Sequence, residues 1–196
     1  IDYVGGTSMG GIMGGLFALG YHPDTLEKLV LEQNWEMVLS DRIPRRQLSM
    51  PEKEQDGKYF FGLPFRDNKI ELPRGVVAGQ SVYNILSYYG SPAYGVDDFS
   101  NLPIPFLCVA ADIETGEPVT LDGGYFPEAL RATMAIPTFF SPVEIDSRLL
   151  VDGGLIDNYP VPEVKAMGAD IIIGVDVQRD LYNKKELNSL VRILEQ

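Results

Sequence analysis

Short apolar runs alternate along this chain with stretches whose apolar residues recur at helical spacing, and no other feature constrains the fold as strongly. Strands are predicted near residues 1–4, 105–111, 117–121, 148–151 and 171–177. Helices are predicted up to Gly20, from Pro23, over 76–89, 127–135 and 160–167, and at the C-terminal end, where Leu187, Leu190, Val191 and Leu194 share one face. Strands that alternate with helices in this way predict a layered α/β fold with a largely parallel sheet.

The 196 residues contain no internal repeat and are expected to form a single domain, 1–196. Residues 40–75 interrupt the alternation and predict an excursion from the core, with a hairpin that pairs 59–65 with 69–72. Basic and aromatic residues gather in this excursion: Arg42, Arg45, Arg46, Tyr59, Phe60, Phe61 and Phe65. Two interpretations stay open, because the segment could contact a membrane through residues 42–65 or pack on the domain or on another chain.

The charge of the chain excludes one class of partner. There are 16 Lys+Arg against 28 Asp+Glu, which gives a formal net charge of −12, whereas nucleic-acid binding depends on basic residues that neutralise phosphates. The single cysteine, Cys108, lies in an apolar run and is predicted to be a small core residue. We expect neither a cofactor nor a metal ion.

The glycine-rich residues 5–15 lead from a predicted strand into a predicted helix and admit three interpretations. A phosphate-binding loop would need a lysine or the G-x-G-x-x-G spacing, and neither is present. A nucleophile elbow fits Gly6-x-Ser8-x-Gly10, because a side chain at either glycine would crowd the sharp turn that presents the serine. Close packing of the helix on the sheet would explain the later glycines, but it gives no reason for the serine.

A nucleophilic serine needs a base, and histidine cannot supply it here. The one histidine, His22, lies past the far end of the helix that Ser8 begins, about 20 Å away at a rise of 1.5 Å per residue. We therefore expect His22 to shape the turn before the second helix, and a lysine or a carboxylate to partner Ser8. Four aspartates lie in or directly after predicted strands, where open α/β sheets build their sites: Asp112, Asp122, Asp152 and Asp176. Asp122 and Asp152 each begin an Asp-Gly-Gly, so the residues alone leave the choice open.

Several stretches together resemble the patatin-like phospholipases, a family of lipid acyl hydrolases. They are 6–10, 129–137, 150–154, 158–161 and 168–170, together with Phe140 and Pro142. The resemblance implies a three-layer α/β/α fold with a central, mostly parallel sheet. It also implies a catalytic dyad of Ser8 and Asp152 that works without histidine. The motif glycines of this dyad would be Gly6, Gly10, Gly153 and Gly154. The resemblance further implies a bacterial protein that is exported or associated with the outer membrane, with a cytoplasmic protein as the alternative.

The resemblance also implies a mechanism, in which Ser8 attacks an ester carbonyl, Asp152 accepts the serine proton, and water later releases the acyl group. We expect a dry pocket to raise the pKa of Asp152, and the backbone N–H of Met9 to donate to the oxyanion. Two features depart from the family. Thr133 stands where a serine is more common, and the glycine-rich loop that supplies further oxyanion donors would lie before Ile1. The chain by itself is therefore expected to be a weak esterase.

Three functions remain open from the sequence. The first is a serine lipid acyl hydrolase, either a phospholipase A or another carboxylic ester hydrolase, with a lipid or small acyl ester as its substrate. The second is an interaction domain that keeps the fold without turnover. The third is an acyltransferase with the same nucleophile. The sequence predicts no particular oligomeric state.

Overall fold

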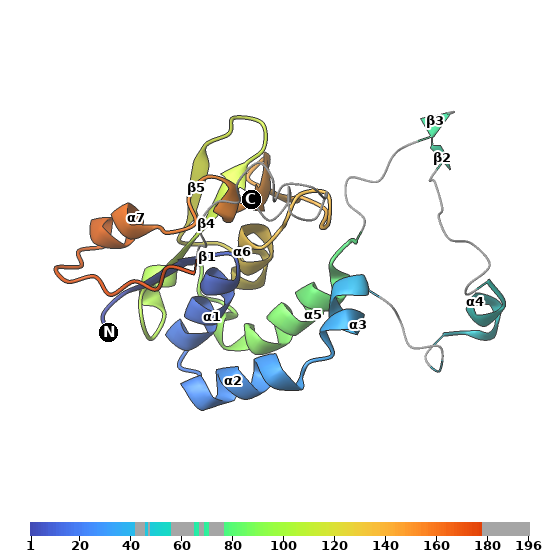
Figure 1. Cartoon of the computed structure of the whole chain (residues 1–196), viewed down its shortest axis with the longest axis horizontal. Coiled ribbons are helices and arrows are strands. Elements are labelled where there is room, and N and C mark those ends of the chain that lie inside the picture. Colours follow the sequence, from blue (N-terminus) through green and yellow to red (C-terminus); the bar gives the residue numbers. More distant parts are fainter. Residues whose placement is uncertain (42–45, 47, 56–64, 67–68, 71–76, 178–196) are drawn as a thin grey trace, which may run out of the picture.

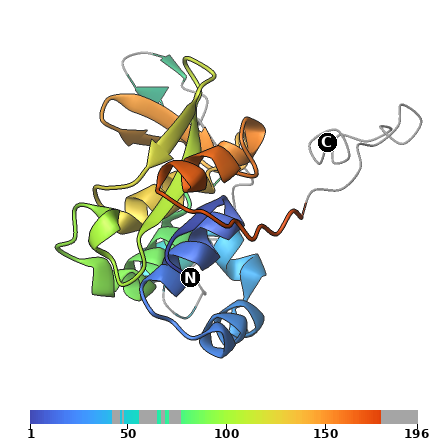
Figure 2. The same ribbon diagram turned by 90° about the vertical axis from the view of Figure 1, so that its left-hand side faces the viewer.

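The computed structural model describes residues 1–41, 46, 48–55, 65–66, 69–70 and 77–177. A β-sheet lies at its centre, with helices packed around it (Figures 1 and 2). The strands are β1 (Val4–Thr7), β2 (Phe65–Arg66), β3 (Lys69–Ile70), β4 (Phe106–Asp112), β5 (Pro118–Leu121), β6 (Val143–Ile145) and β7 (Arg148–Asp152). The α-helices are α1 (Met9–Ala18), α2 (Pro23–Glu32), α3 (Trp35–Ser40), α4 (Met50–Gln55), α5 (Gln80–Tyr89), α6 (Phe126–Thr133) and α7 (Val161–Ala166).

Two neighbouring glycines of β1 show that helices cover both faces of the sheet. A side chain at Gly6 would run into the backbone of Gly10 in α1, whereas a side chain at Gly5 would run into Val164 of α7. Because successive side chains of a strand point to opposite faces, α1 and α7 lie on opposite sides of the sheet. The predicted three-layer α/β/α fold is confirmed.

One edge of β4 carries two strands in tandem. β1 runs parallel to β4 and ends with Thr7 opposite Val109, while β7 runs antiparallel to β4 and ends with Asp152 opposite Ala110. β5 pairs along the other edge of β4, and β6 extends the sheet beyond β7. Every residue of β4 is buried, including Cys108, which is a core residue as predicted.

The described part of the sheet contains more antiparallel pairing than a mostly parallel sheet would. The pairing of β1 with β4 is parallel, whereas β4 with β5, β4 with β7, and β6 with β7 are antiparallel. For the pairs β4 with β5 and β6 with β7, the antiparallel direction follows from the short connection between the two strands. The connections 113–117 and 146–147 are too short for the crossover that parallel neighbours require.

The end of α1 and the start of α2 lie where the sequence predicts them. Gly20, with a φ of 98°, follows the end of α1, and the N–H of Tyr21 turns back to the carbonyl oxygen of Leu16. His22 caps α2, because its Nδ1 accepts the N–H of Asp24 at 3.3 Å. The structural role predicted for His22 is therefore confirmed.

The start of α5 depends on a residue far away in the sequence. The carboxylate of Asp41 accepts the N–H groups of Gly79, Gln80 and Ser81 at 2.6, 3.0 and 2.7 Å. Burial alone would raise the pKa of Asp41, but these hydrogen bonds outweigh burial and lower it. Because this cap sits at Gly79, with a φ of 80°, the helix begins at Gln80 rather than at residue 76 as predicted.

Most of the predicted excursion, residues 40–75, lies outside the described residues, and so does the predicted C-terminal amphipathic helix. In the described part, β2 pairs antiparallel with β3 and places Phe65 opposite Ile70, where the two arms of the predicted hairpin would meet. The membrane contact through residues 42–65 stays a prediction. None of the helices that the structure describes has the length and apolarity of a membrane-spanning segment.

The prediction of a buried strand over 171–177 is wrong. The segment follows α7 as an extended trace (red in Figures 1 and 2), and four of its apolar side chains are 81 to 92% exposed: Ile171, Ile173, Val175 and Val177. A strand is stabilised when its backbone groups pair with a neighbour. None of the described strands pairs with this segment, so its apolar composition does not lead to burial.

We expect Ile173→Thr to change the free energy of unfolding by less than about 0.5 kcal/mol, because its side chain has little packing to lose. As a control, Leu130→Ala removes a fully buried side chain of α6 and should cost about 2–5 kcal/mol. Urea unfolding of the two variants measures both values. A loss of more than about 2 kcal/mol for Ile173→Thr would show that this segment is packed in solution.

Candidate active site

Ser8 occupies a sharp turn between β1 and α1. Its φ of 54° and ψ of −124° lie in a region that L residues rarely adopt, and strain at a strand-to-helix junction is the geometry of a nucleophile elbow. Gly6 has no room for a side chain, because the backbone of Gly10 lies 2.5 Å from the Cβ position. The same expectation is wrong for Gly10, where a Cβ would meet no atom within 4 Å other than its chain neighbours and the backbone of its own helix.

The hydroxyl of Ser8 donates a hydrogen bond to the carboxylate of Asp152, with 2.6 Å between Oγ and Oδ2. The two residues meet because β1 and β7 end at neighbouring positions along the same edge of β4. The other carboxylate oxygen accepts the N–H of Gly154 at 2.8 Å. Both oxygens of Asp152 therefore have a fixed donor.

The two glycines after Asp152 permit this arrangement. A side chain at Gly153 would collide with the carbonyl oxygen of Val109, so the chain passes β4 too closely for any other residue. At Gly154 a Cβ would lie 3.0 Å from the side-chain oxygen of Asn158. Both predicted motif glycines are therefore explained by close contacts.

Burial raises the pKa of Asp152 above the ordinary value for an aspartate, and the hydrogen bonds from Ser8 and Gly154 oppose this shift. The residue is 7% exposed. A carboxylate with a raised pKa binds a proton more strongly than an exposed one, so Asp152 is a stronger base towards the serine hydroxyl.

Thr133 holds the serine turn from the side of α6. Its Oγ1 accepts the N–H of Ser8 at 2.9 Å and donates to the carbonyl oxygen of Val109. Thr133 is fully buried, and its methyl group packs against Gly11 of α1. Because threonine provides the same hydroxyl as serine, its presence here keeps both hydrogen bonds. The sequence singled out this residue but did not indicate its partners.

The N-terminus of α1 lies at the dyad. Met9 is the first residue of α1, so the helix itself leaves its N–H without an acceptor. The start of a helix also carries a partial positive charge that favours nearby anions. This is the position that an oxyanion donor needs, and the role of Met9 stays a prediction.

The other three candidate carboxylates lie elsewhere. Asp122 is exposed and follows β5, on the edge of β4 that faces away from β1. Asp112 ends β4, and its side chain accepts the N–H of Glu114 in the turn that follows. Asp176 belongs to the exposed segment 171–177. Asp152 is the candidate that the structure brings to Ser8.

Histidine and metal ligands do not contribute to this site. His22 precedes α2, and the ten residues of α1, which span about 15 Å, separate it from Ser8. Within the described ranges, no group of three or more His, Cys, Asp or Glu side chains could hold a metal ion.

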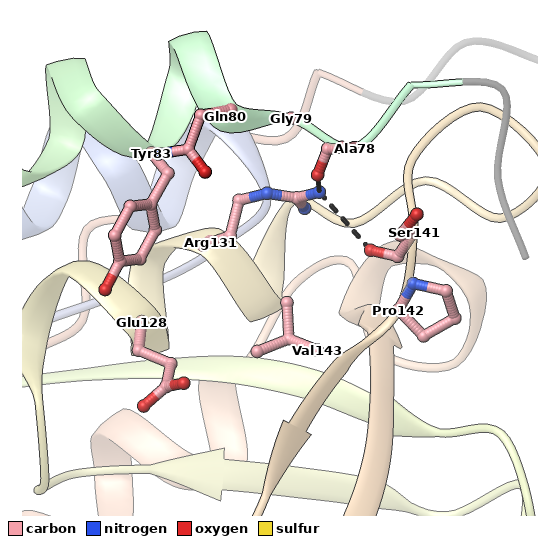
Figure 3. A pocket seen from close by; sticks show the side chains of 9 residues that line it. All are labelled: Ala78, Gly79, Gln80, Tyr83, Glu128, Arg131, Ser141, Pro142 and Val143. Carbon is pink, nitrogen blue, oxygen red and sulfur yellow. Dashed lines mark hydrogen bonds between the residues drawn. The ribbon is translucent and has the colours of Figure 1, made fainter.

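A pocket of about 250 Å³ lies between α5, α6 and β6, and Figure 3 shows the residues that line it. The dyad does not line this pocket. Arg131, 4% exposed, donates from Nη2 to the carbonyl oxygens of Ala78 and Ser141 at 3.0 and 3.3 Å. Its guanidinium also lies 4.6 Å from the ring centroid of Phe140. Arg131 thus ties α6 to the segments on either side, a structural role that the sequence did not indicate.

Gly6 and Gly10 flank Ser8 symmetrically in sequence but not in packing, and a matched pair of variants tests this difference. Gly6→Ala should lower the free energy of unfolding by at least about 1 kcal/mol, because the added methyl group overlaps α1. Gly10→Ala should leave it unchanged or raise it by up to about 1 kcal/mol, because alanine favours the helix and meets no atom. Thermal or urea unfolding compares the two, and equal losses would contradict the packing described for Gly10.

Comparisons with known proteins relate these motifs to a family. The family model described as patatin-like phospholipase matches residues 1–165. An NTE family protein of Mycobacterium tuberculosis is 29% identical over 178 residues, which cover 90% of this chain and 41% of that protein. Lysophospholipase NTE1 of Meyerozyma guilliermondii is 27% identical over 183 residues, 90% of this chain and 10% of that protein. Lysophospholipase NTE1 of Candida albicans is 26% identical over 183 residues, which cover 90% of this chain and 11% of that protein.

The chain therefore spans less than half of the mycobacterial relative and about a tenth of the fungal relatives. The part matched by the family model contains both the turn that presents Ser8 and the strand end that presents Asp152. Together with the three-layer fold, this match shows that the chain belongs to the patatin-like phospholipase family.

Proposed function

We propose that this chain carries the catalytic centre of a serine lipid acyl hydrolase, with Ser8 as nucleophile and Asp152 as general base. The hydrogen bond of 2.6 Å between Ser8 Oγ and Asp152 Oδ2 is the observation that carries the proposal. The family match and the lysophospholipase names of the fungal relatives support a lipid carboxylic ester as substrate. A phospholipid or a lysophospholipid is the substrate class that follows.

In the first half of the reaction, the Ser8 oxygen attacks the ester carbonyl while its proton passes to Asp152. The carbonyl oxygen becomes negative and accepts the N–H of Met9 at the start of α1. When the tetrahedral intermediate collapses, the bond to the leaving alcohol breaks. Asp152 returns its proton to that alcohol, so the acyl group remains on Ser8.

In the second half, water takes the place of the alcohol. Asp152, again ionised, accepts a proton from the water as it attacks the acyl carbonyl. The bond to Ser8 breaks, the serine oxygen regains a proton, and the fatty acid leaves. One carboxylate therefore serves both halves, which the geometry permits because Asp152 already contacts the atom that is acylated.

The dyad can be tested with a matched pair of aspartates. Ser8→Ala should lower kcat/KM for a short p-nitrophenyl ester by at least about 10³-fold, and Asp152→Asn by at least about 10²-fold. Asp122 also begins an Asp-Gly-Gly, but it lies across β4 from Ser8, so Asp122→Asn should leave kcat/KM unchanged. The assignment fails if Asp122→Asn is inactive while Asp152→Asn keeps its activity.

A serine-reactive fluorophosphonate tests the nucleophile without a substrate. Mass added at Ser8 of the wild-type chain, and absent from Ser8→Ala, indicates an activated serine. Lack of labelling at Ser8 in a folded protein would favour an interaction domain without turnover.

The pH dependence of kcat/KM should show an acidic limb that belongs to Asp152. The base must be ionised, so activity is present above the pKa of Asp152 and is lost as the pH falls through it. Because burial raises that pKa, the limb should lie above the ordinary aspartate value of about 3.9. His22→Gln should leave the profile unchanged. Loss of a limb near pH 6.5 in this variant, about the ordinary pKa of histidine, would contradict the dyad.

A further inference from the structure

The pocket between α5, α6 and β6 contains a buried cation that the proposed reaction does not use. The guanidinium of Arg131 lines this pocket, whereas the dyad does not. Its Nη2 donates to two carbonyl oxygens, but its Nη1 is buried without a hydrogen-bond partner among the described residues. Buried polar groups in proteins are almost always paired, so an unpaired donor beside a cavity indicates a place where an acceptor binds.

Arg131 also has no counter-ion within the described part of the chain, where no ion pair joins it to a carboxylate. Burial lowers the pKa of its guanidinium, and the charge of Asp41 opposes this shift only in part. The carboxylate of Asp41 already accepts three backbone N–H groups at the start of α5. Because burial of a charge is unfavourable unless the charge is paired, the guanidinium offers a site for an anionic group.

The same pocket contains a carboxylate. Glu128 precedes Arg131 by three residues on α6, a spacing that puts the two Cβ atoms about 5–6 Å apart on one side of the helix. Side chains at this spacing can form a salt bridge, but Arg131 turns instead to the carbonyl oxygens of Ala78 and Ser141 (Figure 3). The pocket therefore presents a cation and an anion that do not neutralise each other.

An aromatic ring accompanies the carboxylate. Tyr83 and Glu128 both line the pocket, and Glu128 contributes, after burial and Tyr125, to the raised pKa of Tyr83. A carboxylate beside an aromatic ring suits an ammonium group, which is attracted by the negative charge and by the face of the ring. Pro142 and Val143 add apolar surface to the same pocket, where methyl or methylene groups of a ligand could pack.

We propose that this pocket binds a small zwitterion, with its anionic group at Arg131 and its ammonium group at Glu128 and Tyr83. Glu128 would repel a simple anion, and a simple cation would leave Arg131 unpaired. The volume of about 250 Å³ suits a molecule smaller than a drug-sized ligand. The inference goes beyond the proposed hydrolase function and does not depend on it, because neither Ser8 nor Asp152 lines the pocket.

Isothermal titration calorimetry with phosphocholine and with glycine betaine tests the proposal and compares a phosphate with a carboxylate as the anionic group. At least one of the two should bind with one molecule per chain. Inorganic phosphate and choline, which each carry one of the two charges, should each bind at least about tenfold more weakly than that zwitterion.

A matched pair of variants locates the binding. Glu128→Gln should weaken binding of the zwitterion by at least about tenfold without weakening that of inorganic phosphate, because it removes the partner of the ammonium group alone. Glu144→Gln removes the same charge from the exposed residue after Val143, on the other face of β6, and should leave binding unchanged. Ser8→Ala should also leave binding unchanged. Thermal unfolding confirms that each variant is folded.

Four results would overturn the proposal. The first is the absence of saturable binding for both zwitterions. The second is binding of inorganic phosphate as tight as that of either zwitterion, which would indicate a simple anion site. The third is an equal loss of binding in Glu128→Gln and Glu144→Gln. The fourth is a loss of binding in Ser8→Ala, which would assign the ligand to the dyad.

Discussion

The register of two strands along one edge of β4 is the constraint on which the site depends. β1 and β7 approach each other from opposite directions, and their last residues lie opposite Val109 and Ala110 of the same strand. A shift of either strand by one residue would turn its side chains to the other face of the sheet and separate the two groups. The contact between Ser8 and Asp152 is thus fixed by backbone pairing in a fully buried strand rather than by flexible side chains.

The strained turn at Ser8 is held by a contact from α6, and nearby glycines leave the space that the turn needs. A residue in such a backbone conformation costs on the order of 1–3 kcal/mol, which the surrounding structure must offset. The buried hydroxyl of Thr133 satisfies the N–H of Ser8 and bonds the β4 backbone as well, so one side chain joins the elbow, the sheet and the helix. Gly6 and Gly153 let the chain pass close to α1 and β4. The geometry of the turn at Ser8 is therefore a property of the core.

Local sequence signals predicted much of this structure, and contacts between distant residues account for what they missed. The strand-to-helix turn at Ser8, the end of α1 at Gly20 and the cap at His22 depend on residues within one or two turns, so their sequences suffice. The choice of Asp152 over Asp122 depends on which edge of β4 each strand takes, which no tripeptide encodes. The family resemblance supplied that choice. The cap that Asp41 provides for α5 is likewise not visible in a local pattern.

The failed prediction for 171–177 shows the limit of hydrophobicity as a signal. The run has the composition of a buried strand, but burial also requires a neighbour to pair with the backbone, and composition cannot say whether one is present.

The small exposure of Asp152 links substrate binding to the strength of the proposed base. Asp152 is only 7% exposed, and one of its oxygens already contacts the hydroxyl of Ser8. A substrate bound at Ser8 would remove more of the water that still reaches the carboxylate. Removal of water disfavours the ionised carboxylate and so strengthens it as a base towards the serine hydroxyl. In the proposed mechanism, binding of substrate and activation of Ser8 are therefore coupled through the solvation of one carboxylate.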